Sequence, residues 1–339
     1  MGPTVKTLPA LVISLFIASC GIMEPLGTTS DEHASLALKL SMNNTAQTPN
    51  RVIVRVDAKN YNQSKEAPYY HPEGITFSGI PLGDANIYVE ALWEEAKLLD
   101  GHAFINLHSG TNTINVFLNN VLIAYHISPS QENQFDKNTN AKTPFWDMLS
   151  GKNCANLDNP KANAIVTAAL GENALYFLVS LNDEKFIPEN EITGPIGEWI
   201  NDAFILYFCI SSTYQQNFYN SCYRIQCQMG EADPSLAKIH IKGINTPQQV
   251  DLINTIANFQ EIDAKVIVVA ANTRLLEMRI PKDKIGIGGI GKPGDKFAMA
   301  LRYNNVEAQG QTDGDRIDWK NSMSNPLEKP EPWGNLEFQ

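Results

Sequence analysis

The chain has 339 residues, 26 Lys and Arg against 37 Asp and Glu, and a formal net charge of −11 at pH 7. This acidic balance, spread without a long basic run, argues against a nucleic-acid partner because the chain would repel a phosphate backbone. It also offers no polybasic patch that would attract anionic lipid headgroups.

The first twenty residues are typical of an export signal. Lys6 precedes an apolar run from Leu8 to Ala18, which is too short to span a bilayer as a stable helix. The tetrapeptide Ile17-Ala18-Ser19-Cys20 resembles the bacterial lipobox, in which the cysteine receives a diacylglyceryl group and becomes the mature N-terminus. The resemblance implies a signal peptide over 1–19 and an envelope protein held on a membrane by its acyl chains. The alternative is an ordinary secretory signal cut near this point; either way the chain is exported.

Residues 20–34 are expected to form a tether, because they mix Gly, Pro, Thr, Ser and acidic residues without apolar periodicity. Gly21 follows Cys20 where some bacteria use Asp to retain lipoproteins at the inner membrane, so we expect the outer membrane. No second apolar stretch is long enough to span a bilayer.

Residues 35–120 are predicted to form a β-sandwich, because short alternating segments are separated by turn residues. The expected strands are Leu36–Leu40, Arg51–Asp57, Gly74–Phe77, Ala85–Leu92, His102–Leu107 and Thr113–Leu118. The segment Phe77-Ser78-Gly79-Ile80-Pro81-Leu82-Gly83, followed by Ile87-Tyr88-Val89-Glu90-Ala91, resembles the prealbumin-like or carboxypeptidase-regulatory-like sandwich. That resemblance implies a spacer or adhesive module.

The second domain is predicted over 121–339, since an apolar strand and the polar segment Ser128–Thr143 follow residue 120. The stretch Pro247–Phe259 is the single expected helix, because Val250, Ile253 and Ala257 would share one face. The fold class is therefore all-β, with two antiparallel, jelly-roll-like sandwiches in tandem. Expected strands of the second sandwich are Ala164–Leu170, Leu175–Leu181, Ala203–Ile210, Cys222–Met229, Lys238–Ile241, Lys265–Ala270, Leu275–Ile280, Phe297–Tyr303 and Asn335–Phe338.

The four cysteines beyond the lipobox allow two disulfides in any of three connectivities, or free buried thiols. They are Cys154, Cys209, Cys222 and Cys227. A zinc site at the Cys222 and Cys227 spacing lacks a second ligand pair.

A series of segments in the second domain resembles, in order, the carbohydrate-binding modules of family 9, a DOMON-like fold. The resemblance covers about residues 160–338 and implies a sandwich that binds a glycan without transforming it. The segments are Asn173–Val179 with Asn182-Asp183, Trp199–Ile205, Leu275–Pro281 with Lys284-Ile285-Gly286, Leu301–Asn305, Asp318-Trp319 and Trp333–Leu336.

The resemblance places a stacking tryptophan at Trp199 and a hydroxyl-binding arginine at Arg224. An indole packs on the apolar face of a pyranose, and a guanidinium fork suits adjacent hydroxyls. Further ligand contacts are expected from Asn304, Asn305 and Trp319. The alternatives are that Trp199 is a loop anchor, that Trp319 and Trp333 belong to the core or rim, and that Arg224 pairs with Asp202.

Three positions depart from the family pattern. Ile205 stands where the family has a glutamate, Cys222 where an amide is expected, and Leu327 where a second stacking tryptophan would lie. A clamp with two aromatic faces is therefore incomplete.

Two further motifs give weaker functional predictions. The glycine-rich stretch Gly286–Gly291 matches a dinucleotide pattern, but Lys292-Pro293 follows where a helix would have to begin. Asp313, Asp315 and Asp318 could hold a structural calcium, although an Asp-Gly turn needs no metal. No nucleophile or metal-ligand spacing predicts an enzyme, and no cofactor is expected.

The sequence thus predicts a lipid-anchored envelope protein whose second sandwich binds a glycan. The main alternative is a structural or adhesive lipoprotein whose sandwich has lost its sugar site and binds protein. A haem-holding or redox sandwich and a glycosidase fragment are further alternatives.

Overall fold

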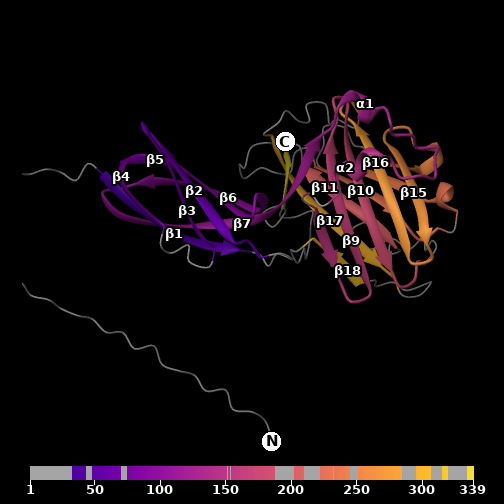
Figure 1. The fold of residues 1–339 in the computed structure, drawn as a ribbon, viewed down its shortest axis with the longest axis horizontal. Helices are drawn as coiled ribbons and strands as arrows, with labels where there is room; N and C mark the ends of the chain where they lie inside the picture. Colours follow the sequence, from indigo (N-terminus) through magenta and orange to yellow (C-terminus); the bar gives the residue numbers. More distant parts are fainter. Residues whose placement is uncertain are drawn as a thin grey trace, which may run out of the picture.

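The computed structural model describes residues 33–42, 48–69, 75–150, 152, 154–187, 202–209, 222–231, 233–244, 251–284, 295–306, 315–319 and 334–339. They form nineteen β-strands and four short helical segments, so the predicted all-β class is confirmed. Figure 1 shows the strands gathered in two sandwiches that lie side by side. The predicted signal peptide and Cys20 lie outside the described residues. None of the described helices is long and apolar enough to cross a membrane.

The first sandwich packs two sheets, ordered β4–β1–β7 and β3–β2–β5–β6–β7. Val52, Val54 and Val56 alternate along β2 and are buried in the core between the sheets, as the sequence pattern predicts. The strands are β1 (His33–Met42), β2 (Arg51–Ala58), β3 (Tyr61–Pro68), β4 (Thr76–Pro81), β5 (Gly83–Trp93), β6 (Ala96–Leu107) and β7 (Gly110–His126).

Strand β7 continues from the first sandwich into the second (Figure 1). Residues 110–118 pair with β1, and Asn119 and Asn120 pair with β6. From Val121 onward the same strand pairs with β19 and then with β9. The change of partners falls at residues 120 and 121, and the backbone runs across this point without a connecting loop. The division into two domains stays a prediction.

The second sandwich has a first sheet ordered β15–β16–β10–β9, in which β8 and the end of β7 each pair with part of β9. Its second sheet is ordered β14–β13–β12–β11–β17, with β18 and β19 on separate parts of β17. The parallel pairing of β19 with β7 joins the two sheets at one edge. The strands are β8 (Ala155–Asp158), β9 (Ala162–Leu170), β10 (Ala174–Asp183), β11 (Ala203–Cys209), β12 (Cys222–Gln228), β13 (Lys238–Ile244), β14 (Asp251–Thr255), β15 (Asp263–Ala270), β16 (Thr273–Pro281), β17 (Lys296–Asn305), β18 (Asp315–Asp318) and β19 (Gly334–Phe338).

The predicted helix over 247–259 is wrong for the part that the structure describes. Asp251–Thr255 forms β14, which pairs antiparallel with β13, and only the short 3₁₀ turn Ile256–Asn258 follows. Ile253 is exposed and not buried on a helical face. The helical spacing in the sequence therefore does not mark a face that packs against the core. The other helical segments are α1 (Pro129–Glu132), α2 (Phe145–Met148) and the 3₁₀ turn Pro234–Leu236.

The cysteines do not form two disulfides. Cys154 is an exposed free thiol and Cys227 a buried one, and burial raises the pKa of the Cys227 thiol. The backbones of Cys209 and Cys222 lie opposite each other as partners in the β11–β12 ladder. The expectation of free buried thiols therefore holds for Cys227, whereas Cys154 is free but exposed.

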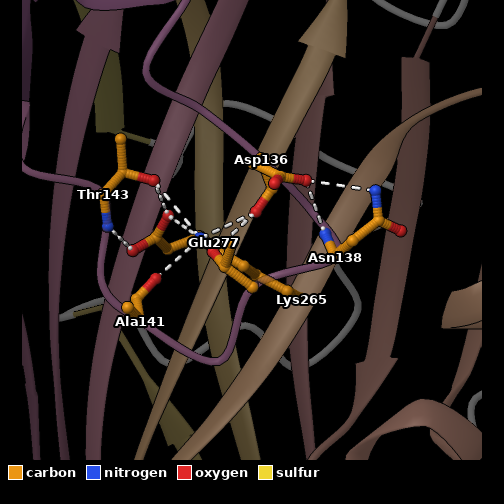
Figure 2. Close-up of polar contacts among 7 residues, drawn as sticks. Asp136, Asn138, Ala141, Thr143, Lys265 and Glu277 are labelled. Carbon is orange, nitrogen blue, oxygen red and sulfur yellow. Dashed lines mark hydrogen bonds and ion pairs between the residues drawn. The ribbon is translucent and has the colours of Figure 1, made fainter.

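A buried ion pair fastens the segment after α1 to the outer face of β15 and β16 (Figure 2). Lys265 Nζ lies 3.4 Å from Glu277 Oε2, and the two side chains are 5% and 0% exposed. The ammonium also donates to the carbonyls of Asp136 and Ala141, at 3.0 and 2.8 Å. Glu277 accepts hydrogen bonds from the backbone N–H and hydroxyl of Thr143. Oxygen atoms thus surround the lysine as they would a bound cation.

Lys265→Met should lower the free energy of unfolding by about 3–5 kcal/mol, because Glu277 would stay buried without its cation. The double variant Lys265→Met/Glu277→Leu should recover part of this loss, since no charge is then buried. Urea unfolding of wild type, Lys265→Met, Glu277→Leu and the double variant measures the coupling energy. The exposed pair Lys142 and Asp147 is the control, and Lys142→Met should cost less than about 1 kcal/mol. Additive effects of the two buried substitutions would contradict the prediction.

Candidate ligand-binding face of the second sandwich

The second sheet of this sandwich turns alternate side chains toward the core and away from it. On β12, Tyr223, Ile225 and Cys227 belong to the core, so Arg224 and Gln226 lie on the opposite side, which we call the polar face. By the same alternation and ladder register, the polar face also carries Tyr207, His240, Lys242, Arg302 and Asn304. All of these side chains are buried except that of Lys242, which is half-buried.

Strand register places Arg224 next to two side chains from the edge of this sheet. Arg224 stands opposite Lys242, and Lys242 stands opposite Asp251. His240 lies two residues before Lys242 on the same face of β13, which makes it the diagonal neighbour of Arg224. The sheet therefore brings an arginine, a histidine and an aspartate together from three consecutive strands.

These three side chains form a hydrogen-bonded relay from the interior to the surface. Arg224 Nη2 lies 3.1 Å from His240 Nδ1, and His240 Nε2 lies 2.6 Å from Asp251 Oδ1. A guanidinium only donates hydrogen bonds, so Nδ1 must accept and the imidazole proton must reside on Nε2, which donates to Asp251. Arg224 is 1% exposed, whereas the side chain of Asp251 is 59% exposed.

The relay favours a neutral imidazole beside an ionised carboxylate. Burial lowers the pKa of His240, and the charge of Arg224 lowers it further, although the hydrogen bond to Asp251 acts in the opposite direction. The hydrogen bond from His240 lowers the pKa of Asp251. At neutral pH the exposed end of the relay is therefore a fixed, charged carboxylate.

The ring-proton resonance of His240 should titrate below pH 6.5, since protonating Nδ1 would place two donors face to face. The stability that neutral His240 contributes should be lost as the pH falls below 6.5, because the unfolded chain then takes up the proton first. A proton NMR titration of the full chain checks this, with His240→Asn identifying the resonance. A midpoint above 6.5 would contradict the relay.

The other expected ligand residues are buried as well. Asn304 and Asn305 are 5% and 2% exposed, and Trp319 is 6% exposed within the core of the sandwich. Asp318 accepts two hydrogen bonds from Arg302, at 2.6 and 3.2 Å, which occupy its carboxylate. Their roles toward a ligand stay predictions.

Several expected site residues lie outside the described residues, namely Trp199, Asp313, Leu327 and Trp333. Asp315 lies in β18, opposite Asn305. Within the described part of the chain, no group of three or more His, Cys, Asp or Glu side chains is arranged to hold a metal ion.

The alternative pairing of Arg224 with Asp202 is wrong. Asp202 is fully buried and accepts hydrogen bonds from the backbone N–H groups of Ile187 and Val306. It thus joins the chain after β10 to the chain after β17 at one end of the sandwich. Burial raises the pKa of Asp202 to about 7, while the two backbone hydrogen bonds lower it.

Replacing Asp202 with Asn should remove a pH dependence of stability. The folded chain holds this proton up to about pH 7, whereas the ordinary pKa is 3.8, so Asp202 stabilises the fold less as the pH rises between these values. Between pH 5 and 8 the stability difference between wild type and variant should change by about 3 kcal/mol in favour of the variant. Urea unfolding at both pH values measures it, and a constant difference would contradict the proposed ionisation.

Two features of the sequence hide His240 and Asp251. His240 has no metal-ligand spacing to another histidine, and Asp251 lies inside the predicted helix. The alternation of Ile239 and Ile241 around His240 could have placed it on the face of β13 away from the core. Its register with Arg224 could not be read from the sequence.

No protein-family model matches the chain, and no curated protein matches it. Among solved structures, it is similar to a carbohydrate-binding module of family 9 from Caldicellulosiruptor kristjanssonii. The complex with glucose gives 13% identity and a TM-score of 0.40 over 65% of this chain and 95% of that one. The complex with cellotriose gives 13% and 0.38 over 65% and 93%. A candidate carbohydrate-binding protein from Bacteroides uniformis gives 10% and 0.41 over 65% and 99%. Similarities of this size do not establish a shared ligand.

Proposed function

We propose that this chain is a lipid-anchored protein of the bacterial outer membrane whose second sandwich binds a glycan without transforming it. The lipobox-like segment ending at Cys20 supports the anchor, and the polar segment that follows it supports a tether. In this proposal the first sandwich spaces the binding domain from the membrane.

The relay of Arg224, His240 and Asp251 is the observation that carries the binding proposal. Burying an arginine and a histidine on the face away from the core is costly unless their hydrogen bonds are satisfied. Here they fix the orientation of one exposed carboxylate, which can accept hydrogen bonds from sugar hydroxyls. Arg224 thereby acts as a positioning residue, and Asp251 makes the polar contact.

Trp199 supplies the second part of the proposal. An indole covers the apolar face of a pyranose while a carboxylate holds its equatorial hydroxyls. A single stacking platform with a few hydrated hydrogen bonds gives weak binding, so the expected affinity is low.

A glycan array with the full chain tests the proposal. The full chain is required because β7 contributes to both sandwiches, and a fragment beginning at residue 121 would cut it. Trp199→Ala should abolish binding, and Asp251→Asn should weaken it about threefold to tenfold, since a charge-assisted hydrogen bond is lost. Glu95→Gln is the control, because Glu95 is 93% exposed on the first sandwich.

Either of two results would refute the proposal. One is unchanged glycan binding by both Trp199→Ala and Asp251→Asn. The other is the absence of any bound glycan on the array, which would favour the structural or adhesive alternative.

A further inference from the structure

We propose that a second sugar site lies on the opposite side of the second sandwich, in a cavity that takes one neutral hexopyranose unit. The cavity has a volume of 370 Å³, within the range of about 300–1,000 Å³ usual for small-molecule sites. It lies on the outer face of the first sheet, because Met278 and Ile280 of β16 belong to the core while Arg279, between them, lines the cavity. Its lining includes Asn133, Phe135, Asp136, Lys137, Asp263 and Arg279.

Residues 133–137 form one wall of the cavity. The carboxylate of Glu132, at the end of α1, holds the start of this wall. Glu132 is 7% exposed and accepts hydrogen bonds from the backbone N–H groups of Glu172 and Asn173, each at 3.1 Å, and from the hydroxyl of Tyr176 at 3.0 Å. A side chain at Gly171 would put its Cβ only 2.7 Å from Glu132 Cδ. A larger residue at this position would therefore push the carboxylate out of these hydrogen bonds.

The same wall is held at its other end by the buried Lys265, which binds the carbonyls of Asp136 and Ala141 (Figure 2). Residues 133–137 are thus fixed to the sheet at both ends, by Glu132 and by Lys265. A cavity bounded in this way keeps its shape without a ligand, which reduces the entropy lost on binding.

A chain of polar groups forms the floor. Lys137 Nζ lies 3.2 Å from Asp263 Oδ1, and Arg279 Nη1 lies 2.9 Å from Asp263 Oδ2. Arg279 Nε continues the chain to the hydroxyl of Tyr176 at 3.3 Å. The two cations and one carboxylate of the floor are offset by the carboxylates of Glu132 and Asp136, so the lining as a whole offers no net attraction for an anion.

Hydrogen-bond donors and hydrogen-bond acceptors are both left for a ligand. Among the described residues, no hydrogen bond is made by Arg279 Nη2, by the side-chain amide of Asn133, or by Asp136 Oδ2. Asn133 and Asp136 are exposed, and the half-buried Phe135 adds an aromatic wall. Donors, acceptors and an apolar ring surface together fit a neutral ring with several hydroxyls. A phosphate would meet the carboxylates of Glu132, Asp136 and Asp263.

Saturation-transfer NMR and titration calorimetry of the full chain with a panel of methyl hexopyranosides test the proposal. At least one should bind with a dissociation constant in the millimolar range, and glucose 6-phosphate should bind more weakly. Asn133→Ala and Arg279→Lys should each weaken binding about threefold to tenfold, because each removes a hydrogen-bonding group. Asn62→Ala, on the first sandwich, is the control. Thermal unfolding reports whether the variants remain folded.

The Trp199→Ala variant separates this site from the one proposed on the polar face. The cavity should still bind the methyl hexopyranoside when Trp199 is removed, even if binding on the glycan array is lost. The cavity proposal fails if no sugar of the panel binds, or if Asn133→Ala and Arg279→Lys both bind as wild type. It also fails if Trp199→Ala alone abolishes monosaccharide binding, a result that would leave the proposed function in place.

Discussion

The backbone hydrogen-bond ladder along β7 is the constraint on which the arrangement of the two sandwiches depends. The strand pairs with β1 and β6 in one sandwich and with β19 and β9 in the other. The partners change at residues 120 and 121, so the backbone of β7 itself connects the two ladders, and the ladder on each side fixes the direction in which the strand leaves its sandwich. Lys97 of β6 adds a contact beside this ladder, because its ammonium lies 2.8 Å from Glu337 Oε2 of β19.

The charged groups on the outer faces of the second sandwich orient neighbouring side chains and segments more than they stabilise the fold. A buried ion pair seldom stabilises a fold beyond what apolar residues of the same size would achieve. Lys265 and Glu277 instead hold a crossing segment in one place, and Arg224 holds His240, which orients Asp251. Each arrangement leaves a fixed polar surface on a rigid sheet, which is the usual requirement for recognition.

Period-two alternation accounts for most of the fold that could be predicted. The strands with a buried face, such as β2, were placed correctly because their valines alternate. β3 was missed because Tyr61–Pro68 is almost entirely polar, and its strand conformation depends on pairing with β2. β14 was mistaken for a helix because short apolar spacing is ambiguous without its partner strand.

The candidate site was predictable only in part, for a related reason. The resemblance drew attention to Arg224, but its contact with His240 depends on cross-strand register, which comes from the whole ladder. Burial was equally hidden, since a short motif around Trp319 cannot show that the indole packs into the core.

The pairing of β19 with β7 also constrains the order in which the chain can fold. Asn335 pairs with Val121, so the partners are 214 positions apart in the sequence (335 − 121). Contacts this distant form slowly, because a long loop must close before they contribute. Until β19 arrives, one edge of the second half of β7 stays open to pairing with another chain. Assembly of the second sandwich is thus exposed to aggregation until its last strand docks.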